Sequence, residues 1–190
     1  MQMEDLIELA KRVQAQQAEA QTVEVKAAHR GCPSKLRDTL SSFSNQNSGG
    51  ILLFGLDENE HFTAVGVYDL QDLQKKVTEQ CNQMQPPVRA LFTTAEYEGV
   101  WICSAEIPSV AYAERPCYYI GAGIQNGSYV RVGDADRHMT DYEIYCFEAY
   151  RNHMHDDERV IERATIDFLD KDLLNAFLTE RRISRVDSAI

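Results

Sequence analysis

Two carboxylates and a lysine near the start of the chain have the spacing of a chemical site. Glu24 and Lys26 lie two apart in residues 22–27, where apolar and polar residues alternate as in a strand, so their side chains share one face. Glu19 comes just before this segment. These groups could serve a reaction at a phosphodiester, although their spacing alone favours an ordinary ion pair on a strand surface.

A third carboxylate follows the most apolar run of the chain. Asp57 comes directly after residues 51–56, a run typical of a central strand, and Glu58 follows it. Sheets flanked by helices commonly keep their chemistry at such strand ends, although these two acids also fit an ordinary turn. Carboxylates gathered here could bind Mg²⁺ or Mn²⁺ for attack on a phosphodiester, with Lys26 offsetting the developing charge. The candidate metal ligands and catalytic residues are Glu19, Glu24 and Asp57.

Several basic residues gather in one short segment. The formal net charge of −11 at pH 7 counts against indiscriminate phosphate binding, because such binding depends on many Lys and Arg contacts. Residues 25–37 nevertheless contain no acidic residue, and their basic residues are Lys26, Arg30, Lys35 and Arg37. If a nucleic acid binds, we expect it at this segment.

The glycine pair Gly49 and Gly50 precedes the apolar run. Without a Cβ atom, these residues could let a phosphate approach the backbone closely, or they could turn the end of a helix into a buried strand. The phosphate-loop motif G-x-x-x-x-G-K-[ST] does not occur in the sequence. Both roles of the glycine pair therefore stay open.

Hydrophobic periodicity predicts the elements that must position these groups. Apolar spacings of three and four predict helices at 4–18, 34–47 and 68–84, with Ser34 as the N-cap of the second. Strands are predicted at 22–27, 51–56, 62–67, 88–95, 100–107, 117–120 and 128–132. We expect strands 88–95 and 100–107 to form a hairpin and the last two strands to pair with each other. This mixed order predicts the α+β class, with a mixed sheet flanked by helices.

Composition bounds the class of protein further. A chain of 190 residues with 44% hydrophobic composition can bury one core. Its five cysteines are scattered without a C-x-x-C pair, which predicts reduced thiols and no zinc site. No apolar run approaches the roughly 20 residues that span a bilayer, and the N-terminus lacks the layout of a secretory signal. We therefore expect a cytoplasmic protein with no membrane contact.

Three ordered motifs resemble the schlafen-type AlbA domain family. They are EAQTVEVK from Glu19 to Lys26, SSFSNQNSGGILLFGLDEN from Ser41 to Asn59 and ERPCYYIGAGIQNGSYVRVG from Glu114 to Gly133. The resemblance implies a single compact domain at 19–138. An amphipathic helix at 1–18 is expected before it, and a helical, acidic extension at 139–190 after it.

The same resemblance implies a nucleic-acid function. Bacterial members are described as DNA-binding or transcription-regulator modules, so DNA is a more natural ligand than RNA. We expect Lys26, Arg30, Lys35, Arg37 and Arg131 to contact phosphates, and Asn45, Gly49 and Gly50 to position the backbone of the ligand. In the eukaryotic schlafen branch, three acids form a metal-dependent ribonuclease site, and by motif they correspond to Glu19, Glu24 and Asp57.

Two departures from the family pattern and two further hypotheses follow. Asp134 and Asp136 stand where Ser and Thr usually follow the R-V-G strand, and they should repel a phosphate near Arg131.

A homodimer, formed through the N-terminal helix or the aromatic C-terminal segment, would rebuild the two-lobed arrangement of the schlafen ribonucleases. The aromatic segment carries Tyr142, Tyr145, Phe147 and Tyr150. The third functional class, besides binding module and ribonuclease, is a protein-interaction module without a nucleic-acid role.

Overall fold

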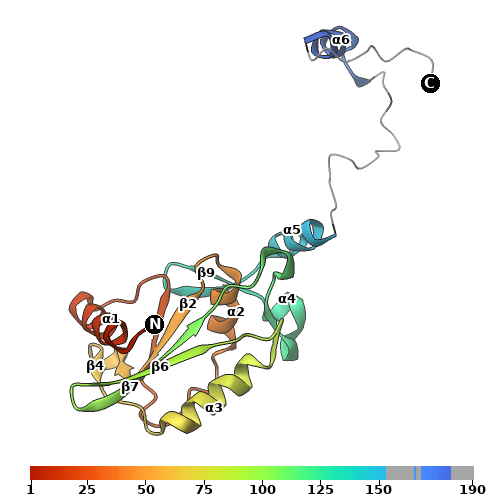
Figure 1. Cartoon of the computed structure of the whole chain (residues 1–190). Coiled ribbons are helices and arrows are strands. Elements are labelled where there is room, and N and C mark those ends of the chain that lie inside the picture. Colours follow the sequence, from red (N-terminus) through yellow and green to blue (C-terminus); the bar gives the residue numbers. More distant parts are fainter. Residues whose placement is uncertain (153–164, 166–167, 181–190) are drawn as a thin grey trace. The chain divides into compact units, whose positions relative to one another are not determined.

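The structure, a computed structural model, describes residues 1–152, 165 and 168–180. Contacts divide the chain into two compact units, Met1–His153 and Met154–Ile190 (Figure 1). Residues 153–164, 166–167 and 181–190 of the predicted C-terminal extension lie outside the described part. The first unit contains the mixed sheet and its flanking helices, which confirms the predicted fold class.

A four-stranded mixed sheet forms the centre of the first unit. Strand β1 runs parallel to β2, and β2, β7 and β6 then follow in antiparallel order. The apolar run is therefore a central strand, as predicted. The bounds of the four strands are β1 Val23–Lys26, β2 Gly50–Phe54, β7 Val100–Ile107 and β6 Leu91–Tyr97.

The β6–β7 hairpin is confirmed, and its turn explains the residues found there. Tyr97 pairs with Val100, so that only Glu98 and Gly99 lie between the strands. Both have positive φ, at 51° and 79°. That backbone is the two-residue turn whose twist matches the twist of antiparallel strands, and glycine adopts it at low cost.

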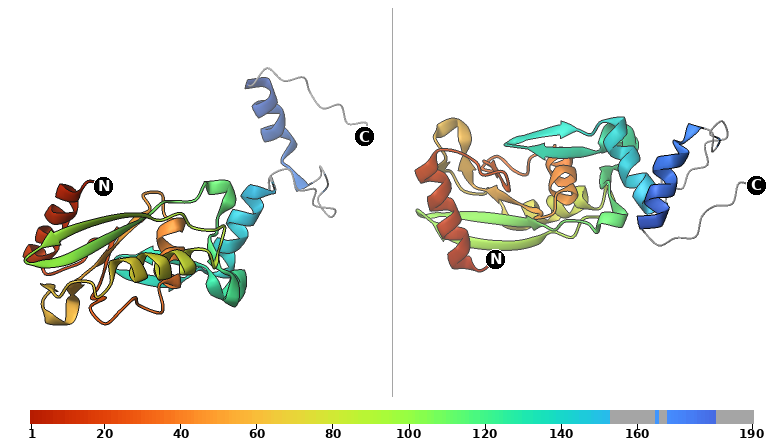
Figure 2. Two further views of the ribbon diagram at one scale, coloured as in Figure 1. Left: turned by 60° about the horizontal axis from the view of Figure 1, so that its bottom comes forward. Right: turned by 90° about the horizontal axis from the view of Figure 1, so that it is seen from above.

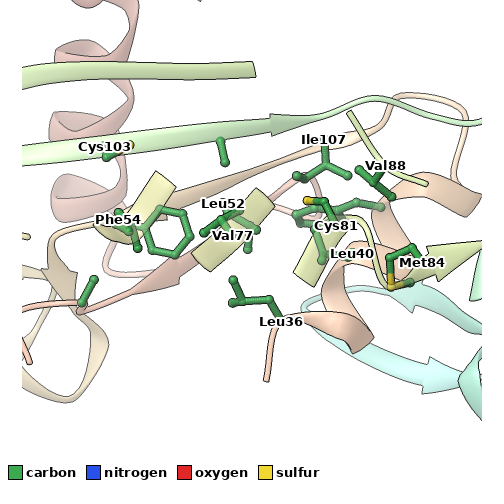
Figure 3. Packing of buried hydrophobic residues seen from close by; sticks show 14 of the residues in the cluster. Leu36, Leu40, Leu52, Phe54, Val77, Cys81, Met84, Val88, Cys103 and Ile107 are labelled. Atoms are coloured by element: carbon green, nitrogen blue, oxygen red, sulfur yellow. The ribbon is translucent and has the colours of Figure 1, made fainter. Parts of the chain in front are cut away.

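Helices α2 (Arg37–Asn45) and α3 (Leu70–Cys81) pack on one face of this sheet (Figure 2). Figure 3 shows the resulting core, in which Leu36 and Leu40 meet Leu52 and Phe54 of β2, and Val77 of α3 lies among them. Each of these side chains is fully buried. Burial of a large aliphatic or aromatic side chain contributes about 1.5–3 kcal/mol, so this cluster fixes the position of both helices.

Helix α1 (Met3–Gln16) covers the opposite face of the sheet. Its apolar stripe, Leu6, Leu9, Ala10 and Val13, is buried against residues of β1, β2, β6 and β7. Because this stripe is buried within its own unit, it does not offer the dimer contact that the amphipathic pattern suggested.

Gly49 and Gly50 turn the end of α2 into β2. Gly49 has a φ of 65°, and a Cβ atom on it would collide with the carbonyl oxygen of Ile107. A Cβ atom on Gly50 would collide with the ring of Phe43. The fold alone thus requires both glycines, which agrees with the second of the two roles considered for them, the turn into a buried strand.

Several predicted element boundaries differ from the structure, and the predicted N-cap of α2 and the predicted pairing of the last two strands are wrong. Ser34 does not cap α2, which begins at Arg37 with Leu36 as its N-cap residue. The amide of Leu36 is instead satisfied by Gln80 Oε1 of α3 at 3.0 Å. No periodicity within α2 reveals this tertiary partner.

Segments 117–120 and 128–132 meet only at the bridge between Tyr118 and Ser128. The glycine-rich stretch between them folds as the short helices η3 (Ile120–Ala122) and α4 (Gly123–Gly127), so it does not connect a hairpin. Each segment finds another partner. Antiparallel pairs join β5 (Met84–Gln85) to β8 (Tyr118–Tyr119), β9 (Tyr129–Val132) to β10 (Ala135–His138), and β3 (Leu56–Asp57) to β4 (Thr63–Ala64).

The aromatic segment after the domain is helical, as expected. Helix α5 (Asp141–Arg151) begins with a capping box in which Thr140 and Glu143 satisfy each other's backbone amides. The second unit contains helix α6 (Lys171–Glu180). Among the described residues, no helix has the length and hydropathy needed to cross a membrane.

Candidate nucleic-acid interface

Arg131 of β9 lies inside the domain, with its side chain 1% exposed. Its guanidinium contacts Glu24 Oε2 at 2.8 Å, Asp136 Oδ1 at 3.0 Å and Glu19 Oε2 at 3.7 Å. It also donates to the carbonyl oxygens of Val23 and Gln21, at 3.3 and 3.4 Å. We call Arg131, Glu19, Glu24 and Asp136 the Arg131 cluster. Held in this way, Arg131 does not reach a phosphate at the surface, contrary to the expected role.

Asp136 connects the Arg131 cluster to helix α2. Thr39 Oγ1 donates to Asp136 Oδ2 at 2.7 Å, and Ser42 Oγ donates to Asp136 Oδ1 at 2.6 Å. Burial alone would lower the pKa of Arg131, but its hydrogen bonds with Asp136 and Glu24 outweigh burial, and the pKa is raised. The arginine is therefore a permanent cation. Asp136 was expected to repel a phosphate near Arg131. In the structure it instead forms an internal ion pair with Arg131.

Among the carboxylates of this cluster, Glu19 has the weakest ion pair, because its oxygen lies farthest from the Arg131 guanidinium. Arg131 and Lys26 supply two cations, and Lys26 also bonds Glu24, so three carboxylates face two positive charges. Burial raises the pKa of Glu19 from 4.5 to about 7; a hydrogen bond from the Val25 amide at 2.7 Å lowers it, while nearby negative charges raise it. Protonation of Glu19 brings the charges into balance.

An acidic pocket of about 360 Å³ lies beside Glu19. Its wall contains Glu58 and Asp134 together with His61 and Phe62. The negative charge of Glu58 contributes to the raised pKa of Glu19. An incoming phosphate would meet like charges here, so this pocket does not suit the backbone of a nucleic acid.

The predicted metal ligands Glu19, Glu24 and Asp57 do not form one group. Asp57 Oδ1 accepts hydrogen bonds from the backbone amide and the side chain of Asn59, at 3.0 and 3.2 Å, and so caps the short helix η1 (Glu58–Glu60). In the part of the chain that the structure describes, no three His, Cys, Asp or Glu residues are placed to hold a metal ion. The residues present do not fit Mg²⁺ or Mn²⁺ in this arrangement, so the ribonuclease hypothesis stays a prediction from the resemblance.

Asn45 has a structural place that accounts for all of its polar atoms. It is buried, its Nδ2 donates to the carbonyls of Cys117 and Tyr129 at 2.9 and 3.0 Å, and its Oδ1 accepts from the Cys117 amide at 2.7 Å. These bonds join α2 to the segment before β8 and to β9. Asn45 therefore has no polar atom left for a ligand, and the residues of the glycine pair are both buried.

The remaining basic residues divide into internal and accessible ones. Lys26 bonds Glu24, whereas Arg30 and Lys35 are exposed in the loop between β1 and α2. Arg37 follows at the start of α2, where its guanidinium lies 3.6 Å from Asp38. Three of the five predicted phosphate contacts, Arg30, Lys35 and Arg37, are thus brought together on one accessible segment.

A pocket of about 410 Å³ opens where this segment meets α3. We call it the α2–α3 pocket, and it is lined by Cys32, Pro33, Ser34, Arg37, Lys76, Glu79, Gln80, Gln83 and Tyr119. Lys76 adds a further cation, which is held 2.8 Å from Asp72 one turn earlier on α3. Sequence patterns did not reveal Lys76, Gln80 and Tyr119, because each joins the basic segment only through tertiary packing.

Comparisons with known proteins agree with this fold. The family model described as "Schlafen, AlbA_2" matches residues 19–140. The N-terminal domain of a RecG-related protein from Nitrosomonas europaea is 22% identical, with a TM-score of 0.54 over 71% of this chain and 93% of that one. The DIP2311 protein from Corynebacterium diphtheriae is 16% identical, with a TM-score of 0.49 over 93% of this chain and 34% of that one. No curated protein matches the chain.

The raised pKa of Glu19 predicts a pH-dependent stability. The folded state holds the proton up to about pH 7 and the unfolded state only to about 4.5, so this carboxyl stabilises the fold fully below pH 4.5 and loses that contribution as pH rises through 7. Glu19→Gln should therefore unfold at higher urea concentration than the wild type at pH 8. The gain is on the order of 1 kcal/mol, since solvent screens part of the charge.

The gain should shrink toward zero as the pH is lowered to 5. Glu60→Gln is the matched control, because Glu60 is exposed on η1 and its substitution should change stability little at either pH. If Glu19→Gln is instead less stable than the wild type at pH 8, the negative charge of Glu19 is needed to hold Arg131, and the account of the cluster is wrong.

Proposed function

The chain belongs to the Schlafen AlbA_2 family, and on that basis we propose that it is a nucleic-acid-binding protein whose ligand is DNA rather than RNA. A role in regulating transcription is the expectation carried by the family resemblance. The solved domain from Nitrosomonas europaea belongs to a protein named for its relation to an ATP-dependent DNA helicase, which is compatible with DNA as the ligand.

One observation supports this proposal most strongly: four cations lie on the loop between β1 and α2, at the start of α2 and on α3, around the α2–α3 pocket or next to it in the chain, although the protein is strongly acidic. Arg30 and Lys35 are exposed, and Arg37 and Lys76 line the α2–α3 pocket. A local group of cations can hold a phosphate backbone even when the net charge is negative, because screening at physiological salt limits the reach of distant acids to about 8 Å.

Accessibility separates these cations from the Arg131 cluster. Arg131 is buried among carboxylates and Lys26 bonds Glu24, with the acidic pocket beside Glu19, whereas Arg37 and Lys76 stay accessible although each pairs with an aspartate. These observations support a ligand position on the loop between β1 and α2 and on the neighbouring side of α3. The expected binding is weak and dependent on salt, since only a few phosphates can be contacted there.

Binding of labelled duplex DNA, single-stranded DNA and single-stranded RNA at low and physiological salt tests this proposal. The double variant Arg30→Gln/Lys35→Gln should bind more weakly, and the slope of log affinity against log salt should fall by about 0.7–0.9 for each phosphate that is no longer neutralised. Lys11→Gln/Arg12→Gln is the matched control, since it removes the same charges from the exposed side of α1.

Equal weakening by both double variants would show that only total charge matters, and the absence of binding at low salt would overturn the proposal. Shortened strands in Mn²⁺, lost in a Glu24→Gln variant, would instead support the metal-dependent ribonuclease.

Aromatic residues on α5 support a second role, self-association into the predicted homodimer. Tyr112 of the short helix η2 (Tyr112–Glu114) packs against Phe147 and Tyr150, with ring centroids 5.2 and 4.6 Å apart. Tyr142 and Tyr150 are 74% and 57% exposed, so an aromatic surface faces outward. Exposed apolar surface of this kind is typical of protein–protein contacts.

Sedimentation at micromolar concentration tests this association. We expect a dimer that dissociates in a Tyr142→Lys variant, because a charge at the centre of a contact opposes its burial. A monomer mass for the wild type would exclude the homodimer.

A further inference from the structure

We propose that the α2–α3 pocket receives one unpaired base of a single-stranded nucleic acid, stacked on the guanidinium of Arg37. This inference deepens the proposed function and rests on it, because it specifies which form of nucleic acid the same surface selects. It is argued from the shape, the planar groups and the charges of the pocket.

Arg37 and Tyr119 bring two planar groups, a guanidinium and an aromatic ring, together at the pocket wall. The Arg37 Cζ atom lies over the Tyr119 ring, 4.9 Å from its centroid. The Arg37 side chain is 42% exposed, so it is accessible on the side away from the ring. A guanidinium plane stacked on an aromatic ring can carry a nucleobase as the next layer.

The Tyr119 ring is held in place before any ligand arrives. Tyr119 is only partly exposed and packs against the core below α2 and α3. A Cβ atom on Gly121 would approach the Tyr119 ring to 2.5 Å, so the ring lies directly against the backbone of Gly121. Because the Tyr119 ring that lies under Arg37 is already ordered, the ring loses little conformational entropy when a base stacks on Arg37.

The polar groups of the pocket fit the edge of a base better than a bare phosphate. Gln80 is fixed, with its Nε2 donating to Pro33 O at 2.9 Å and its Oε1 accepting from Leu36 N at 3.0 Å. Glu79 and Gln83 line the same wall with exposed side chains. Glu79 would repel a phosphate, but it can accept hydrogen bonds from the amino groups of a base. The pocket volume of about 410 Å³ lies within the usual range for small-ligand sites.

The thiol in the pocket does not point to covalent chemistry. Burial raises the pKa of Cys32 to about 11, so the thiol stays protonated at neutral pH. The pocket therefore suits binding rather than covalent chemistry. Lys76 lines it and Lys35 is exposed next to the lining residue Ser34, so we expect both to contact phosphates that flank the bound base.

Selection for single strands follows from this geometry. A base in a duplex is paired and stacked on both sides, so it can enter the pocket only at the cost of being flipped out. A single strand offers its bases without that cost, whereas the phosphates of the two forms present the same kind of charge.

Two DNA strands of equal length and charge, one normal and one with every base replaced by an abasic spacer, test the inference. The wild type should bind the normal strand about 5- to 150-fold more tightly, the range expected when one base is deprived of its stacking partner. Arg37→Lys keeps the charge but removes the plane, so this preference should fall to near one while the salt dependence stays unchanged. Lys75→Arg, on the exposed side of α3 outside the pocket, is the control and should keep the full preference.

The outcomes separate this inference from the proposed function. Salt-dependent binding of the abasic strand as tight as that of the normal strand would overturn the base pocket and leave the nucleic-acid function intact. A full preference retained by a folded Arg37→Lys variant would show that the base does not stack on Arg37. If no strand binds at low salt, the proposed function falls and the base pocket with it. In a parallel titration, duplex DNA bound as tightly as the normal single strand would also overturn the base pocket, whereas weaker binding of the duplex would support it.

Discussion

The buried positive charge of Arg131 is the interaction on which the arrangement of this domain depends. One guanidinium joins β9 to the start of the sheet through Glu24 and the carbonyls of Val23 and Gln21, and joins both to α2 through Asp136. Removing one partner of a buried ion pair typically costs about 3–5 kcal/mol, which is a large part of the roughly 5–15 kcal/mol that stabilises an ordinary domain. The ion pairs of Arg131 therefore hold Glu24 and Asp136 in fixed positions inside the domain.

The carboxylates that resemble a ribonuclease site and the cations proposed to bind a ligand thus have different structural roles. The acids that resemble a ribonuclease site are either bound to Arg131 or, for Asp57, used to cap η1. Burial, together with the nearby negative charges, raises the pKa of Glu19. The accessible cations that we propose to contact phosphates are not part of this cluster; they lie on the loop before α2, at the start of α2 and on α3. A strongly acidic protein can thus present a local group of accessible cations outside its buried Arg131 cluster.

Local signals in the sequence were sufficient for the central strand and the hairpin of the sheet. The apolar run at 51–56, the turn at Glu98 and Gly99 and the glycine pair before β2 each carry their structural reason within a few residues. The burial of Arg131 and the pairing of β8 with β5 could not be predicted, because their partners lie far away in the chain. The same holds for the α2–α3 pocket, where Arg37, Lys76 and Tyr119 come together only once α2, α3 and the segment after β8 are packed.

Amide hydrogen exchange with and without saturating single-stranded DNA tests the central claim most directly, because it shows which surface meets the ligand. The account predicts slower exchange at 29–37, 76–83 and around Tyr119, with no change at 17–24, 57–62 and 129–136. Protection at those last three segments and none at the α2–α3 pocket would contradict it. That result would place the nucleic acid at the Arg131 cluster, against carboxylates that otherwise serve only the fold.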